Sequence, residues 1–207
     1  MYEQAGSLHM KPSVSSPTHK ISGSIRIALI GFGRQKKISE DQIIQALALL
    51  PDDHLVDLLC VKYDPDRDIK YSGWYDPNQK GIIIFRFKDE WDFYQLLYHE
   101  IAHHVFDNVL SVDERYRWVN EISHFEGSVS SYALKNTQED FAETYAQYVR
   151  GPMWLIEMPE KFRFMNKVVF SGSDDGNRLR IRRRHKYQTV KTGRITVPPT
   201  HQPSWLS

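Results

Sequence analysis

The chain has 207 residues, enough for one domain with a sizeable core but short for two. Its 27 Lys and Arg nearly balance its 26 Asp and Glu, but eight basic and no acidic residues lie in residues 176–207, so residues 1–175 carry about −7. The single cysteine, Cys60, excludes an intrachain disulfide. No run approaches the roughly 20 apolar residues of a transmembrane helix, and the first residues lack the apolar core of a signal peptide.

The amino-terminal region divides into a polar leader and the start of a domain. Residues 1–23 contain almost no large apolar side chains, which predicts a disordered leader. Residues 24–30, SIRIALI, alternate and then run apolar, as a strand entering a core does. In residues 39–50 the apolar side chains share one helical face, with Ser39 as the N-cap. A strand and a helix should therefore open the domain.

The middle of the chain predicts more strands and then a long helix. Residues 54–63 are typical of a strand, and residues 69–87 of two strands joined at the turn sequence DPNQKG. We expect the second of these, residues 81–87, to be the sheet edge along which an extended peptide could add as a further strand. Residues 89–109 repeat apolar side chains every three or four positions, with Asp89 or Glu90 at the positive helix end.

Helices are predicted over the remaining part of the domain. They cover residues 113–125, 137–149 (with Thr137 as N-cap) and 159–170. The expected fold class is α+β: a single domain over residues 24–170, with a small mixed sheet followed by a helical C-terminal part. Residues 171–207 have a linker-like start and a basic continuation, which predicts a flexible tail.

The stretch LLYHEIAHHVF contains an H-E-x-x-H motif, formed by His99, Glu100 and His103. Residues four apart lie on the same helical face, so both imidazoles can bind one cation, and Zn²⁺ suits such ligands. Glu100 can then act as the base for a metal-activated water. His104 points about 100° away from His103, so we expect a hydrogen bond to a neighbouring helix or to solvent. The alternative is that both histidines are ordinary hydrogen-bonded helix residues.

A third zinc ligand has to come from another helix. Glu139 and Glu143, in QEDFAETY, also lie four residues apart on one face. One carboxylate could bind zinc while the other accepts the free N–H of a ligand histidine. The spacing alone leaves open which glutamate has which role.

Three segments, YHEIAHHVFDN, SYALKNTQEDFAETYAQYV and PEKFRFMNKVVF, resemble the catalytic domain of the anthrax lethal factor family of zinc metallopeptidases, which includes the secreted Pro-Pro endopeptidases. The similarity covers about residues 70–170. It implies a zincin-like fold, one zinc ion per chain and peptide hydrolysis. It also implies that Glu139 is the third ligand, that Glu143 supports a ligand histidine, and that Tyr132 donates a hydrogen bond to the oxyanion. Asp140 departs from the family pattern, where an aromatic residue often stands.

Other functions fit parts of the sequence. The basic residues of 178–186 could bind nucleic acid or another anionic surface, although no base-reading motif accompanies them. A zincin-like module that binds without catalysis is a further alternative, against which the presence of Glu100 and Tyr132 counts. We expect a monomer with a peptide or protein substrate. The sequence favours neither a secreted nor a cytoplasmic location, and it does not define the cleavage specificity.

Overall fold

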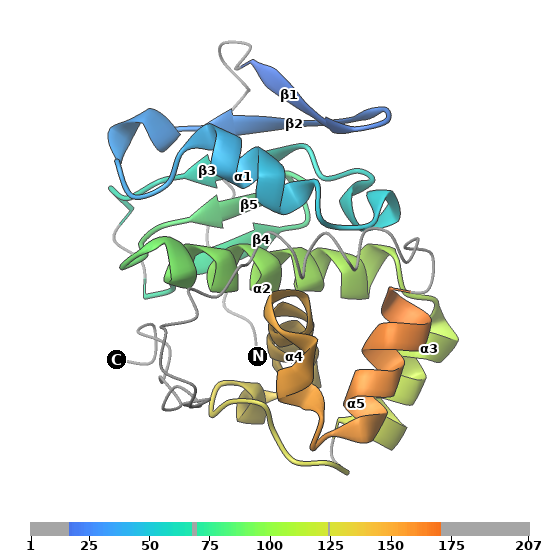
Figure 1. Ribbon diagram of the computed structural model, residues 1–207. Coiled ribbons are helices and arrows are strands. Elements are labelled where there is room, and N and C mark those ends of the chain that lie inside the picture. Colours follow the sequence, from blue (N-terminus) through green and yellow to red (C-terminus); the bar gives the residue numbers. More distant parts are fainter. Residues whose placement is uncertain (1–16, 68–69, 124, 171–207) are drawn as a thin grey trace, which may run out of the picture.

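The predicted strands form one mixed sheet, which lies beside a group of helices (Figure 1). This computed structural model describes residues 17–67, 70–123 and 125–170. The basic tail and most of the expected leader lie outside the described residues. The fold is α+β, as the sequence predicts, with the strands in the order β1-β2-β3-β5-β4. No helix in the described part of the chain is both long and apolar enough to cross a membrane.

The first strand corrects the predicted boundary of the leader. Residues 18–22 were expected to be disordered, but they form β1 (Thr18–Ser22), which pairs antiparallel with β2 (Ile25–Ile30). Gly23, with a φ of 43°, allows the tight turn between them. Ile21 contributes a buried side chain to the core. One buried apolar side chain and a partner strand are enough to order residues 18–22, because the β-ladder pairs their backbone N–H and C=O groups.

The other end of the sheet corrects the predicted edge strand. β3 (Cys60–Tyr63) pairs parallel with both β2 and β5 (Gly81–Ile84), and β4 (Gly73–Asp76) pairs antiparallel with β5. β5 is therefore an interior strand, and β4 is the edge. All four residues of β5 are buried, as expected for a continuous apolar strand covered on both faces. Residues 54 and 55, predicted as the start of a strand over residues 54–63, belong instead to the 3-10 turn η2 (Asp52–Leu55).

Two helices connect and cover the strands. α1 (Glu40–Leu47) joins the parallel strands β2 and β3, and Ser39 caps it as predicted, in a capping box with Gln42. α2 (Glu90–Asn108) has Asp89 as its N-cap and lies between the sheet and the remaining helices (Figure 1). It contacts β4 and β5 on one side and α4 on the other. Most of α2 is therefore buried, including His99 and Glu100 of the H-E-x-x-H motif, whereas His103 is half-buried.

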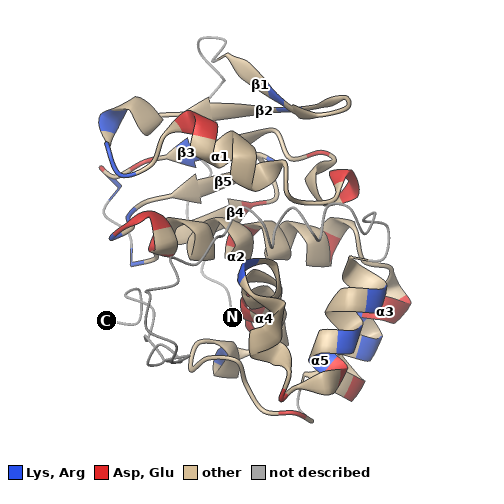
Figure 2. Ribbon diagram, in the orientation of Figure 1, with Lys and Arg blue, Asp and Glu red and all other residues tan. Residues whose placement is uncertain are grey.

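The helical C-terminal part packs against the side of α2 that faces away from the sheet (Figure 1). It contains α3 (Val112–Arg117), α4 (Thr137–Arg150) and α5 (Pro159–Phe164); α3 and α5 continue as the π-helical turns η3 (Trp118–Ile122) and η6 (Met165–Val169). Charges of both signs mark α3 and α5, whereas acidic residues mark the first turn of α2 (Figure 2). The N-cap of α4 is Asn136 rather than the predicted Thr137, because the Asn136 side chain accepts the N–H groups of residues 138 and 139.

Two buried polar side chains connect segments of the C-terminal part with one another and with the rest of the chain. Lys161, which is fully buried, donates to Asp140 Oδ1 (2.5 Å) and to the Gly127 carbonyl (2.7 Å). His54 hydrogen-bonds through its two ring nitrogens to Tyr145 Oη and to the Val169 carbonyl, both at 2.8 Å. Burial lowers the pKa of His54, so the ring stays neutral at physiological pH.

Candidate metal centre

Two helices bring three ligand-type atoms together. His99 and His103 lie one turn apart on α2, with their Nε2 atoms 3.2 Å from each other. Oε2 of Glu139, in the first turn of α4, lies 3.0 Å from His99 Nε2 and 3.4 Å from His103 Nε2. The Asn136 cap fixes this first turn, because it accepts the backbone N–H of Glu139 itself (2.9 Å). The three residues form a candidate metal-binding cluster.

These separations fit the donor set of a tetrahedral zinc site. For ligand atoms about 2.1 Å from zinc, the edges of a tetrahedron measure about 3.4 Å, close to the three distances above. Glu139 Oε2 is buried and has no aligned hydrogen-bond donor in the described part of the chain, although two ring nitrogens lie so near. A cation bound by all three atoms would give the buried Glu139 Oε2 a partner. Two imidazoles and one carboxylate are also the ligand types of catalytic zinc sites.

The charges around the cluster favour a cation. Burial by itself would lower the pKa of His99, but contacts with Glu139 and Glu143 raise it to about 10. Burial would raise the pKa of Glu139, but His103 and His99 hold it far below its usual range. The same negative surroundings that stabilise a protonated imidazole would stabilise a bound metal ion in its place.

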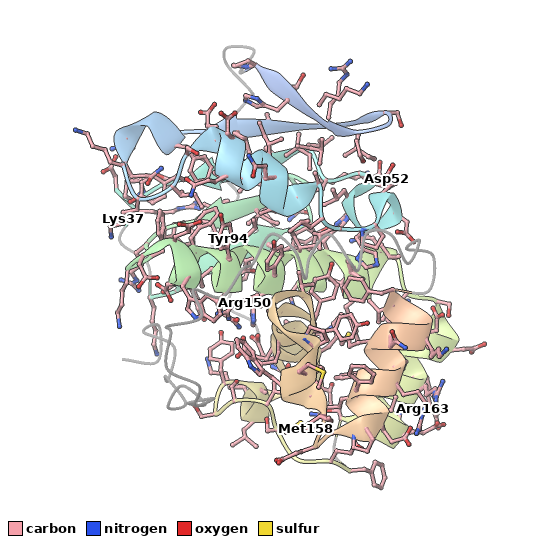
Figure 3. The ribbon with its side chains drawn as sticks, in the orientation of Figure 1. Lys37, Asp52, Tyr94, Arg150, Met158 and Arg163 are labelled. Atoms are coloured by element: carbon pink, nitrogen blue, oxygen red, sulfur yellow. The ribbon has the colours of Figure 1, made fainter. Side chains whose placement is uncertain are left out.

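Glu143 orients His99 from behind. Its Oε1 lies 2.7 Å from His99 Nδ1, so an N–H at that position donates to the carboxylate and leaves Nε2 facing Glu139. Gln95 Nε2 donates to the same oxygen (3.2 Å), and Ser130 Oγ donates to Oε2 (2.8 Å). Arg150, labelled in Figure 3 where α4 meets α2, donates in turn to Gln95 Oε1. Sequence reasoning missed Gln95 and Ser130, because nothing in their local pattern marks them.

Glu100 lies beside the cluster and is only 6% exposed. Burial raises the pKa of its carboxyl, while His99, His103 and a backbone hydrogen bond from Tyr75 oppose that shift. The backbone of β4 runs directly past it: a Cβ added to Gly73 would lie 2.6 Å from Glu100 Oε1. The absence of a side chain at position 73 therefore leaves room for the carboxylate.

Tyr132 and His104 have different surroundings. The Tyr132 ring lies 5.6 Å from the His99 ring, centre to centre, just before the 3-10 turn η4 (Ala133–Lys135). Burial, followed by the charges of Glu139, Glu100 and Glu143, raises the pKa of its phenol, which stays protonated. His104 bonds to Tyr75 Oη (3.0 Å) and the Val56 carbonyl (2.9 Å), so its partners are a strand and a loop rather than the expected helix or solvent.

A pocket opens beside these residues. It is lined by three segments: residues 70–73 at the start of β4, one face of α2, and the turn around η4. The lining side chains include His99, Glu100 and Tyr132, which sequence reasoning identified, and Lys70, Tyr71 and Lys135, which it did not. A substrate in this pocket would therefore touch the candidate metal centre.

Comparisons of the chain with models of protein families, with curated proteins and with solved structures found no match.

Proposed function

We propose that the protein is a zinc-dependent endopeptidase with a zincin-like fold, related to the anthrax lethal factor family. The observation that carries this proposal is the convergence of His99, His103 and Glu139 on one point, with Glu100 and Tyr132 beside it at a pocket. A purely structural metal site would need no buried carboxylate beyond its ligands and no phenol facing the same pocket.

Each residue near the pocket has a role that its environment supports. A bound zinc ion would supply Lewis acidity, which polarises a peptide carbonyl and acidifies water. Glu100 takes a proton from the attacking water and delivers it to the leaving amine. Tyr132, kept protonated by its surroundings, donates its O–H to the developing oxyanion.

The edge strand suggests how an extended peptide would bind. Within the described residues β4 is paired on one side only, and it begins at the pocket, so a peptide could add along β4 and place its backbone next to Glu100. This proposal replaces β5, which is paired on both sides, as the docking strand.

The test combines zinc quantification with cleavage of a peptide library. Wild type and Glu100→Gln should each hold about one zinc ion, while the kcat of the variant should fall about 100-fold to 10,000-fold. Glu121→Gln, at a position that forms an exposed ion pair with Arg117, is the matched control and should cut as wild type does. A Glu100→Gln protein that cuts at the wild-type rate would overturn the mechanism.

A further inference from the structure

Two lysines from different segments of the chain line the pocket. Lys70 belongs to the segment that leads into β4, and Lys135 to the turn η4, yet both line the same pocket as His99 and Glu100. Both residues are exposed. The pocket therefore combines a partly buried metal-type centre with an outer pair of positive charges.

Local contacts hold both lysines near the pocket. The Lys135 ammonium lies 3.4 Å from the centre of the Tyr132 ring, a cation–π contact beside the proposed oxyanion donor. The Lys70 carbonyl accepts a hydrogen bond from Arg86 (2.6 Å), and the Ser72 carbonyl accepts the Phe85 N–H (2.9 Å). These bonds fix the backbone of residues 70–72 against the chain that follows β5.

Neither ammonium is neutralised by a carboxylate of the described chain. Lys62, Lys80 and Lys161 each pair with an aspartate, whereas among residues 17–67, 70–123 and 125–170 no ion pair involves Lys70 or Lys135. Of the nearby carboxylates, Glu139 faces the two histidines, and Glu143 is held by His99, Gln95 and Ser130. Glu100 itself lines the pocket but is only 6% exposed. Among the described lining residues, the exposed charges are thus those of the two lysines.

From this arrangement we propose that the pocket selects peptides carrying an acidic side chain close to the scissile bond, with Lys70 and Lys135 as its specificity residues. The inference rests on the proposed peptidase function. A substrate carboxylate between the two ammonium groups would accept charge-assisted hydrogen bonds, and Tyr71 would supply an apolar wall beside it. Asparagine has nearly the same shape without the charge, so it should bind more weakly.

The test measures binding separately from cleavage. Zinc-loaded Glu100→Gln protein is titrated with fluorescent hexapeptides in which each position in turn is Asp, Asn or Lys, and anisotropy reports the affinity. At one position at least, the peptide with Asp should bind about 25-fold more tightly than the peptide with Asn. This preference corresponds to about five-fold for each lysine. Adding Lys70→Gln or Lys135→Gln to this protein should each reduce the preference for Asp about five-fold. Adding both substitutions should abolish it. The preference should also weaken as salt is raised.

The controls separate the two proposals. Lys88→Gln changes an exposed lysine outside the pocket and should leave the Asp preference intact. Equal affinity for Asp and Asn at every position, or a preference that survives loss of both lysines, overturns the inference. If the preference is present but zinc-loaded wild type cuts none of these peptides, the proposed peptidase function fails while the acid-binding pocket stands.

Discussion

Gly73 and Glu100 show how closely single residues are fitted around the candidate site. In the proposed mechanism Glu100 moves between the water and the leaving amine, and it lies in a buried position where little space remains. The backbone of β4 approaches it so closely that a methyl group on Gly73 would lie 2.6 Å from Oε1 and 3.1 Å from Cγ. Since real Cβ contacts are not that short, the carboxylate would have to shift.

Gly73→Ala should therefore lower activity with little effect on the fold. We expect kcat to fall about 100-fold, because a displacement of about 1 Å at a reacting group can have an effect of that size. Zinc content and melting temperature should stay close to wild type. Gly33→Ala is the control, since a Cβ there meets nothing within 4 Å. Steady-state kinetics that do not distinguish the two variants would count against the role of this close approach.

At the scale of elements, the site depends on the packing of α4 against α2. α4 carries Glu139 toward the two candidate ligand histidines and Asp140 toward Lys161 of α5. Lys161 also bonds to the Gly127 carbonyl, in the segment that leads to Ser130 and Tyr132. Asp140, which departs from the pattern of the lethal factor family, thus has a partner of its own in this chain. The buried pair connects α4, α5 and the segment that leads to Tyr132.

Lys161→Met should destabilise the protein strongly, because it leaves the Asp140 carboxylate buried without its cation. The expected loss in free energy of unfolding is about 3–5 kcal/mol, measured by urea denaturation. Lys167→Met, at an exposed position in η6, should change stability by less than about 0.5 kcal/mol. Combining Lys161→Met with Asp140→Leu should recover much of the loss. A double variant no more stable than the single one would show that packing, rather than the ion pair, dominates at this position.

At the scale of the whole molecule, α2 links the two halves of the fold. The sheet covers one side of this helix and the helical C-terminal part covers the other (Figure 1). His99 and His103 belong to α2, whereas Glu139 belongs to the C-terminal part. A metal ion held by all three would therefore crosslink α2 to α4 and stabilise the packing between them.

Removal of the metal should accordingly lower the melting temperature. A ligand at 1,000 times its dissociation constant stabilises the folded state by about 4 kcal/mol, and for a domain of this size that is roughly 8–16 °C. Differential scanning calorimetry with and without a chelator measures the shift. His103→Ala, which removes one ligand, should melt at the same temperature in both conditions. A wild-type protein that is indifferent to chelation would contradict the zinc site.

Local sequence patterns predicted the helices and the relation of the two histidines well. Periodicity placed α1, α2 and α4 to within a few residues, and helix geometry alone puts His99 and His103 on one face. The N-cap of α4 was misplaced by one residue, because Asn136 and Thr137 are both good caps and only the backbone conformation decides between them. β1 was missed because its order depends on a partner strand rather than on its own composition.

The sequence by itself determined which side chains recur on one helical face, since that depends only on residues three or four apart along the chain. The tertiary structure decided which of the two strands in the hairpin is the edge, and that Glu139 rather than Glu143 meets both histidines. It also decided that Lys70 and Lys135 share a pocket. These relations join residues tens of positions apart, and they arise from how the sheet and helices pack, which no local pattern encodes.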